Sequence, residues 1–424
     1  MKLKQLSHKH LCPLLTCLCL GALAVSCVND DLGCIEDKPG YIEGNNIWLS
    51  FDIQTEGAID KPFSRSDAFG SRAGEDGPDD NGHPDEVATP AENYISPTDI
   101  LLVLLDGNRN VMKVFDDKEY ALSTPINGTN NTQYTITAEI NKVYFDYITT
   151  DLFDLSILVI ANINGTGDGS FPLSKLYVKS LTSVSQFQYN FGLPRGAANV
   201  SWFPLTPDRR IPMAGLKHFK VNKTDLFAST ESNRYDLNTA DNPIYVQRSI
   251  AKIRVFDNIA ENANLKITGV EVKGITNRGA YMPDLTVTGC EQWAEGTKML
   301  EKATMATSWF DAAASVSAVL TQAGDEGSGD YTDVDNNEFT EAFIAYLPEI
   351  DLSVESPVLS ITGRYSNNTE RVWEFPLNEY VKGIDITRNH IYEFTVTAAL
   401  DSELQLKYTL CPMGHYITDI PGFE

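Results

Sequence analysis

Histidine, positive charge and recognisable catalytic motifs are all scarce in this chain of 424 residues. Only six histidines occur, and no two of them have the His-x-x-x-His spacing of a helical zinc site. The sequence also lacks a Gly-x-Ser-x-Gly nucleophile elbow and a Gly-x-x-x-x-Gly-Lys phosphate loop. We therefore expect a protein that is not an enzyme and that needs no cofactor and no metal.

Cysteine is too scattered to brace the fold. Of the seven cysteines, three fall in the first 26 residues and a fourth is Cys27, which leaves Cys34, Cys290 and Cys411 far apart in the sequence. Such spacing fits neither a disulfide framework nor a Cys-x-x-Cys metal site. The mature protein must be stabilised by its hydrophobic core, and we expect Cys411 to be a small buried side chain.

Acidic residues outnumber basic ones by 58 to 33, which gives a net charge of −25. A surface of this sign repels phosphate backbones and anionic lipid headgroups. This charge therefore disfavours nucleic-acid binding and polybasic membrane docking, and we expect no nucleic-acid partner.

The one apolar run near the N-terminus is short. It extends from Leu11 to Val25 behind Lys2, Lys4 and Lys9, which is the arrangement of a secretory signal. The run ends in small residues before Cys27, and Leu23-Ala24-Val25-Ser26-Cys27 resembles a bacterial lipobox. This resemblance implies a signal peptide over residues 1–26 and a lipid, palmitate included, on Cys27. Loss of the signal removes three lysines and no acid, and the charge of −25 becomes −28.

Two stretches at opposite ends of the chain share a strand pattern. The first runs from Ile47 to Ile53, and the second opens the tail Leu404 to Glu424. Apolar side chains alternate with polar ones in both, as in a strand with one buried face. The apolar positions are Ile47, Leu49, Phe51 and Ile53 in the first, and Leu404, Leu406, Tyr408 and Leu410 in the second. Each stretch is either an ordinary strand of its own domain or one of two competitors for the same groove.

The segment from Glu56 to Tyr94 is rich in Gly, Asp, Pro, Ser and Glu. It has too little apolar surface to offset the entropy cost of ordering, so the composition predicts an exposed loop. Arg65 and Arg72 lie within it and are candidate sites for a trypsin-like protease. A cut at either residue would separate the first apolar strand from the rest of the chain.

The body of the chain predicts short β-strands separated by turns, with no long helical periodicity and no internal repeat. Asn-Gly dipeptides at Asn127-Gly128 and Asn164-Gly165 fit tight turns. We expect an all-β chain of two β-sandwich domains, with a boundary near Asp241. The expected strands cover residues 100–106, 111–115, 133–140, 155–161, 210–213, 245–256, 265–273, 339–347, 358–365, 371–375 and 391–398.

An acidic run between Asp325 and Glu338 suggests calcium at first sight. Counted from Asp333, however, the sixth position is Glu338 where an EF-hand needs Gly, and the twelfth is Ile344 where it needs Glu. We interpret the run as a solvated loop between strands.

Four short motifs, in order along the chain, resemble signatures of the Bacteroidales fimbrillins, the FimA- and Mfa-type fimbrial subunits. They are Leu158-Val159-Ile160-Ala161-Asn162, Ile211-Pro212-Met213-Ala214-Gly215, Val246-Gln247-Arg248-Ser249-Ile250-Ala251-Lys252-Ile253 and Arg388-Asn389-His390-Ile391-Tyr392. Each motif alone is weak, but four of them behind a lipobox form a fairly specific set, and the resemblance runs from the lipobox to the C-terminus.

This resemblance implies two transthyretin-like β-sandwich domains, an N-terminal strand that an arginine-specific protease removes, and a C-terminal strand donated to the next subunit. The implied order is a signal peptide (1–26), a propeptide with Cys27 and the removable strand (27–72), an N-terminal domain (73–240), a C-terminal domain (241–403) and a donor tail (404–424). Beyond Leu410, the donor tail continues through Pro412 and Gly414 into Ile417, Ile420 and Phe423.

The function implied is that of a structural subunit of a cell-surface fimbria that supports adhesion, exported as an outer-membrane lipoprotein. Its partners would be copies of itself or homologous subunits and the arginine-specific protease. The alternative is a monomeric outer-membrane-anchored adhesin, or a tip or anchor lipoprotein, that binds a host or glycan ligand.

Overall fold

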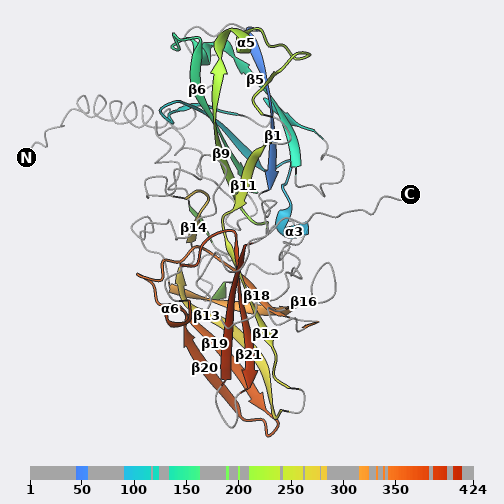
Figure 1. The fold of residues 1–424 in the computed structure, drawn as a ribbon, viewed down its shortest axis with the longest axis vertical. Helices are drawn as coiled ribbons and strands as arrows, with labels where there is room; N and C mark the ends of the chain where they lie inside the picture. The colour runs from blue at the N-terminus through green and yellow to red at the C-terminus, as the bar shows by residue number, and fades with distance from the viewer. Residues whose placement is uncertain are drawn as a thin grey trace, which may run out of the picture.

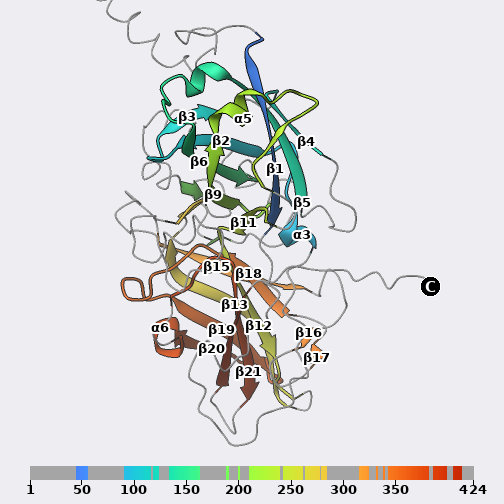
Figure 2. The same cartoon turned by 45° about the horizontal axis from the view of Figure 1, so that its top comes forward.

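The computed structural model describes residues 44–55, 90–115, 118–123, 133–162, 188–190, 199–200, 210–238, 242–260, 263–276, 278–283, 315–323, 331–332, 338–339, 342–381, 385–398 and 404–412. These residues form two curled β-sheets, one above the other along the long axis of the molecule (Figures 1 and 2). The buried apolar side chains make one cluster that runs through both sheets. The prediction of an all-β chain with two β-sandwich domains in tandem is confirmed.

The N-terminal sheet has the order β3-β2-β6-β9-β11-β1-β5-β4, and β10 pairs with β1. Its strands are β1 (Asn46–Thr55), β2 (Ile100–Asp106), β3 (Val111–Val114), β4 (Tyr120–Leu122), β5 (Gln133–Asn141), β6 (Leu152–Ala161), β9 (Met213–Asn222), β10 (Tyr235–Asp236) and β11 (Ile244–Arg248). The continuous apolar run of β2 is buried on both faces, as its sequence predicts.

The C-terminal sheet has the order β20-β19-β13-β15-β18-β12-β21-β22, and β8 pairs with β15. Its strands are β8 (Asn199–Val200), β12 (Ala251–Asp257), β13 (Leu265–Thr276), β15 (Ser315–Ala323), β18 (Ala342–Leu347), β19 (Val358–Tyr365), β20 (Glu370–Pro376), β21 (His390–Ala398) and β22 (Leu404–Pro412). In this order the chain places its last described strand, β22, at an edge.

The remaining elements are small. Two ribbons pair β7 (Gln188–Asn190) with β14 (Arg278–Ala280) and β16 (Tyr331–Thr332) with β17 (Glu338–Phe339). The helical turns are α3 (Pro90–Asn93), η2 (Lys142–Phe145), α5 (Lys223–Phe227) and α6 (Leu377–Tyr380). Among the helices of the described ranges, none has the length and apolar character needed to cross a membrane.

Three expected strands differ from the observed ones. The strand expected over residues 339–347 falls on β17 and β18, which belong to different sheets. The run Tyr245 to Phe256 is split into β11 and β12, which belong to different sheets, and the chain crosses between the sheets at Ser249 and Ile250. The crossing thus lies beyond Asp241, where we expected the boundary, because the apolar pattern continues through it without a turn signal. The strand expected over residues 210–213 instead begins at Met213 and continues to Asn222 as β9.

Close packing between β9 and β11 depends on Gly215. A Cβ atom built there would overlap the backbone oxygen of Tyr245 and lie 3.0 Å from the carbonyl carbon of the same residue. Backbone atoms cannot swing away as a side chain can, so this position requires glycine.

We predict that Gly215→Ala lowers the free energy of unfolding of the N-terminal domain by about 1–3 kcal/mol, as overpacking does. Gly269→Ala is the matched control, because the nearest atom to its added Cβ is 3.9 Å away. Calorimetric melting of both variants tests the prediction, which fails if the two variants melt alike.

Candidate functional site

The first strand, β1, lies in the middle of the N-terminal sheet and is paired on both sides. It pairs antiparallel with β5 from Asn46↔Asn141 to Gln54↔Gln133. On its other side it pairs parallel with β10 at Leu49 and Ser50 and with β11 from Ile53 to Thr55. In the described part of the chain, β5 and β11 form no ladder with each other. The sheet is therefore continuous only while a strand fills the place of β1.

The inward face of β1 carries the four side chains that the alternation predicted. Ile47, Leu49, Phe51 and Ile53 are at most 1% exposed. Their antiparallel partners on β5, Ile140, Ala138, Ile136 and Tyr134, are buried as well. At roughly 1.5–3 kcal/mol for each large apolar side chain, the burial of these four contributes on the order of 6–12 kcal/mol. This groove and its occupant form the candidate functional site.

The outward face of β1 is held by polar contacts. The Asp52 carboxylate accepts a hydrogen bond of 2.5 Å from the Thr135 hydroxyl. Asn238 contacts only the backbone of Asp52: its Oδ1 accepts from the amide at 2.6 Å, and its Nδ2 donates to the carbonyl at 3.1 Å. The Ser229 hydroxyl likewise accepts from the Trp48 amide at 2.9 Å. Backbone contacts of this kind do not depend on the side chains of the strand that occupies the groove.

Sequence reasoning missed Ser229 and Asn238. They lie in polar, aperiodic sequence around α5 and β10, where no pattern marks a residue that will contact a strand distant in the chain. Only the tertiary fold brings them beside β1.

Tyr134 closes the groove near the end of β1. It stands opposite Ile53, is 2% exposed, and donates its hydroxyl to the carbonyl of Ile95 at 3.3 Å. Burial, and then the neighbouring Tyr94, raises the pKa of Tyr134 to about 12. The phenol is therefore neutral at physiological pH, and this part of the groove stays uncharged.

The two ends of the chain segment that joins β1 to the body lie together at the junction of the sheets. Thr55, the last residue of β1, donates its hydroxyl to the carbonyl of Asn93 in α3 at 2.9 Å. Helix α3 lies between the two sheets (Figure 1). The segment 56–89 therefore leaves and rejoins the described structure at nearly the same place.

Buried polar groups fix α3 to both domains. Arg248 of β11 donates to the carbonyl of Glu92 at 3.0 Å, to the Asn93 side chain, and to the side chain of Asn389 at 2.6 Å. The Glu92 carboxylate is fully buried, lies 2.7 Å from the Lys252 ammonium and accepts from the Tyr346 hydroxyl at 2.6 Å. Since Lys252 and Tyr346 belong to the C-terminal sheet, α3 connects the domains through charge-assisted hydrogen bonds.

The four resemblance motifs meet at this junction. Asn162 ends the first motif in a left-handed conformation (φ 61°) and donates to the carbonyl of Ile211 in the second at 2.8 Å. The carbonyl of Pro212 accepts from the amide of Ser249 in the third motif at 2.8 Å, and the carbonyl of Ile250 accepts from the amide of Asn389 in the fourth at 2.8 Å. The motifs therefore meet at the connection between the sheets, and of the four the third also borders the groove, where Val246 pairs with Thr55.

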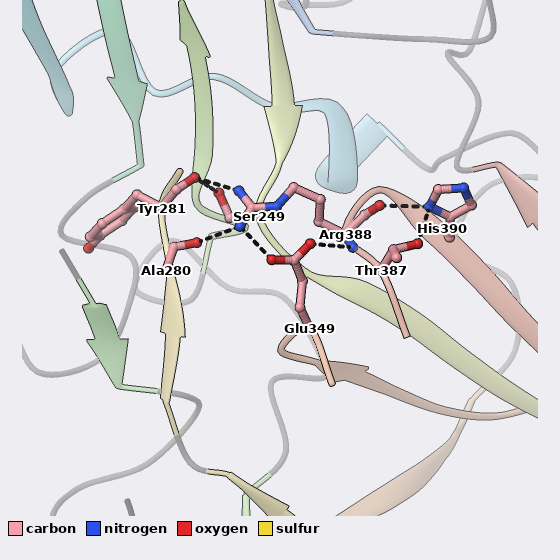
Figure 3. A network of polar contacts seen from close by, with 7 residues as sticks. All are labelled: Ser249, Ala280, Tyr281, Glu349, Thr387, Arg388 and His390. Atoms are coloured by element: carbon pink, nitrogen blue, oxygen red, sulfur yellow. Dashed lines mark hydrogen bonds and ion pairs between the residues drawn. The ribbon is translucent and has the colours of Figure 1, made fainter. Parts of the chain in front are cut away.

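Figure 3 shows the centre of the fourth motif. The buried Arg388 pairs with the Glu349 carboxylate at 2.7 Å and donates to the carbonyl of Tyr281 at 2.8 Å, which also accepts from the Ser249 hydroxyl at 2.7 Å. His390 donates through Nδ1 to the carbonyl of Arg388 at 2.7 Å, and the same nitrogen lies 2.9 Å from the hydroxyl of Thr387. Burial lowers the pKa of His390. These contacts tie the start of β21 to the sheet crossing.

The tail strand β22 is paired differently from β1. It forms an antiparallel ladder with β21, from His390↔Pro412 to Ala398↔Leu404, and no other ladder among the described residues. Leu404 is 7% exposed and Leu406 is partly buried against the core. Tyr408 pairs with Phe394, and Leu410 pairs with Tyr392.

Several predicted site residues fall outside the described residues. They are the lipidation site Cys27, the cleavage candidates Arg65 and Arg72, and the distal tail positions Ile417, Ile420 and Phe423. Within the ranges that are described, no group of three or more His, Cys, Asp or Glu side chains could hold a metal ion.

We predict that Glu92→Gln destabilises the precursor by about 3–5 kcal/mol, because it leaves the Lys252 ammonium buried without its counter-charge. Glu370→Gln is the matched control, since its pair with Arg364 is about half exposed at 51% and 52% and is worth at most about 1 kcal/mol. Thermal melting separates the two variants, and equal melting temperatures would refute a structural role for the junction charges.

Of the comparisons with known proteins, only the one with solved structures finds similar chains. No protein-family model and no curated protein matches the sequence. Among solved structures, the tip fimbrial protein Mfa3 from Porphyromonas gingivalis is similar at a TM-score of 0.43 and 12% identity, over 87% of this chain and 99% of that one. A fimbrial assembly protein from Parabacteroides distasonis is similar at a TM-score of 0.44 and 13% identity, over 86% and 98%. Both are fimbrial proteins by their descriptions, the kind of protein that the sequence motifs resemble, and with TM-scores below 0.5 the likeness carries no further argument.

Proposed function

We propose that this chain is a structural subunit of a cell-surface fimbria that polymerises by donor-strand exchange and supports adhesion. Each subunit loses β1 by proteolysis and accepts the C-terminal strand of another copy, or of a homologous subunit, in its place. In this proposal the protein catalyses no reaction and carries no cofactor. The position of β1 is the observation that carries the proposal.

A replacement strand at the place of β1 would gain both backbone pairing and the burial of apolar side chains. Its loss would divide the N-terminal sheet into β3-β2-β6-β9-β11 on one side and β5-β4 on the other. The strands on both sides would then present unpaired backbone groups, and the side chains beneath β1 would be uncovered. An extended peptide repairs both defects at once, with main-chain hydrogen bonds for affinity and alternate side chains for specificity.

The junction allows β1 to leave without loosening the body. Glu92 and Asn93 are held by Arg248, Lys252 and Tyr346, none of which belongs to β1. After a cut at Arg65 or Arg72, α3 would still be fixed at the junction. The released strand would keep only its non-covalent contacts with the sheet.

The tail strand β22 is held by fewer neighbouring strands than β1. β22 is an edge strand with a single ladder, whereas β1 has partners on both sides. To act as a donor, β22 must leave β21, and it exchanges one ladder for two. This difference in pairing favours transfer of the tail into an emptied groove over its return to the edge.

We further propose that the precursor reaches the outer membrane as a lipoprotein anchored through Cys27. A trypsin-like, arginine-specific protease then acts on the segment that holds Arg65 and Arg72, and the cut separates the anchor and β1 from the body.

We predict that Arg65→Ala together with Arg72→Ala yields a folded precursor that does not polymerise after treatment with an arginine-specific protease or with trypsin. The reason is that β1 stays covalently linked to the rest of the chain. Arg65→Lys with Arg72→Lys is the matched control, since it keeps both charges. This control should resist an arginine-specific protease but mature with trypsin. The measurement is a denaturing gel of unboiled samples with N-terminal sequencing of the main band.

Heat-sensitive ladders in the alanine variant would overturn the protease step. A clean cut of the unaltered precursor after Arg65 or Arg72 that releases β1 but leaves only monomers would overturn donor-strand exchange. That second result would favour the monomeric, membrane-anchored adhesin.

A further inference from the structure

We infer that the donor tail enters the groove in a single register, with Lys407 at the position of Ser50 and beside Asp236 of the accepting subunit. The inference rests on the proposed function and deepens it, because it names the contact that aligns one copy of the chain on the next. It follows from the spacing of apolar residues in β1 and in the tail and from the residues around β1.

The first constraint is the number of inward positions. The groove takes four apolar side chains, at Ile47, Leu49, Phe51 and Ile53, and the tail offers four at the same spacing, from Leu404 to Leu410. A shift by two residues that moves Leu404 to the position of Leu49 would leave Ser402 at that of Ile47. Such a shift puts a polar side chain where a fully buried isoleucine now packs, which is costly.

The second constraint is Pro412. If the donor strand runs as β1 does, a shift in the other sense moves Pro412 to the position of Ile53, which is paired with Tyr134 on one side and Ile244 on the other. If it runs the opposite way, the equivalent shift moves Pro412 to the position of Ile47, which is paired with Ile140. Proline has no amide hydrogen and is confined to edges and strand ends. In the register with four filled positions, Pro412 instead lies outside the β1–β5 ladder, which runs from Asn46 to Gln54. It reaches the position of Thr55, which pairs only with Val246 on β11, or, in the opposite direction, that of Asn45.

Lys407 lies midway among the four apolar residues of the tail, and Ser50 lies midway among those of β1. Lys407 therefore falls at the place of Ser50 whichever way the donor strand runs. The residues in register with Ser50 are Thr137 on β5 and Asp236 on β10. Side chains of residues in register point to the same face of a sheet, so the lysine and the aspartate become neighbours.

The charges around this position favour the tail over β1. Asp236 is exposed and forms no ion pair within the described ranges. Glu139 lies two residues beyond Thr137 on β5 and faces the same side of the sheet. Arg234 is the basic residue nearby, and it donates to the Thr137 hydroxyl at 2.9 Å. The outward face of β1 adds a further carboxylate, Asp52, to these acidic residues, whereas the same face of β22 has Lys407 and no acid.

Disulfide trapping between the donor tail and β5 of the accepting subunit tests the register directly. The parent is the full precursor with Cys290→Ser and Cys411→Ser, matured by protease, so that engineered cysteines alone remain in the mature chain. Thr137→Cys is combined in turn with Gln405→Cys, Lys407→Cys or Thr409→Cys. We expect the Lys407→Cys combination to give covalent ladders on a non-reducing gel, and the other two to give several-fold less.

The outcomes separate the register from the function. Strongest trapping at position 405 or 409, or polymers without trapping at any of the three, would overturn the register and leave strand exchange standing. A parent that is cut but forms no polymers would overturn the proposed function, and the register with it.

Charge exchange tests the contact with Asp236. Lys407→Glu should slow polymerisation roughly 1.5- to 5-fold, the range expected for one cross-strand charge pair. Adding Asp236→Lys to Lys407→Glu should restore the rate, which a merely structural effect of the first change would not allow. Lys266→Glu, an exposed reversal on β13, is the control for net charge. Equal slowing by Lys266→Glu, or no rescue in the double variant, would contradict the pair.

Discussion

The double pairing of β1 is the constraint on which the N-terminal domain depends. The ladders with β5, β10 and β11 satisfy backbone groups that no other described strand reaches. A central position of this kind is unusual for a strand joined to its domain by so long a segment, 56–89. The N-terminal domain therefore depends on a strand that a single cut in that segment can detach.

The junction explains how such a strand can be detachable while the two domains remain joined. All four motifs that carry the fimbrillin resemblance lie there, and the buried pairs Glu92–Lys252 and Arg388–Glu349 lie there too. Buried ion pairs add little net stability compared with apolar packing, yet breaking one partner is costly. They hold particular residues in fixed places, and here they hold α3 and the sheet crossing. The motifs are therefore explained by geometry at the junction and not by any chemistry in the groove.

The sequence predicted the strands well where one face is buried. Alternation located β1 and β22 to within a residue or two, and the continuous run of Ile100–Asp106 identified a strand buried on both faces. It failed at Ser249 and Ile250, because a chain that passes from one core directly into another stays apolar throughout. It also missed most of β9, where Lys217, His218 and Lys220 obscure the pattern.

The neighbours of a strand cannot be predicted in this way. Alternation gives the buried face of β1 but not its central place, nor the edge position of β22, because pairing is decided between segments far apart in the chain. For the same reason Asp236, Asn238 and Ser229 carry no sequence signal. The candidate groove was thus half predicted: its apolar floor follows from the sequence, and its polar walls follow only from the fold.

In the proposed exchange, the covalent link between β1 and α3 would set the direction. While peptide bonds join β1 to α3, the strand is presented to its groove intramolecularly, at an effective concentration that a tail from another molecule cannot match. Thr55 and Asn93 are in contact, so the link begins and ends at nearly the same place. After the proposed cut, β1 would compete only at its bulk concentration, while each bound tail would be attached to a whole subunit whose own groove could be filled in turn. Growth of the proposed fibre would then deplete free grooves, and a released β1 would find none to which it could return.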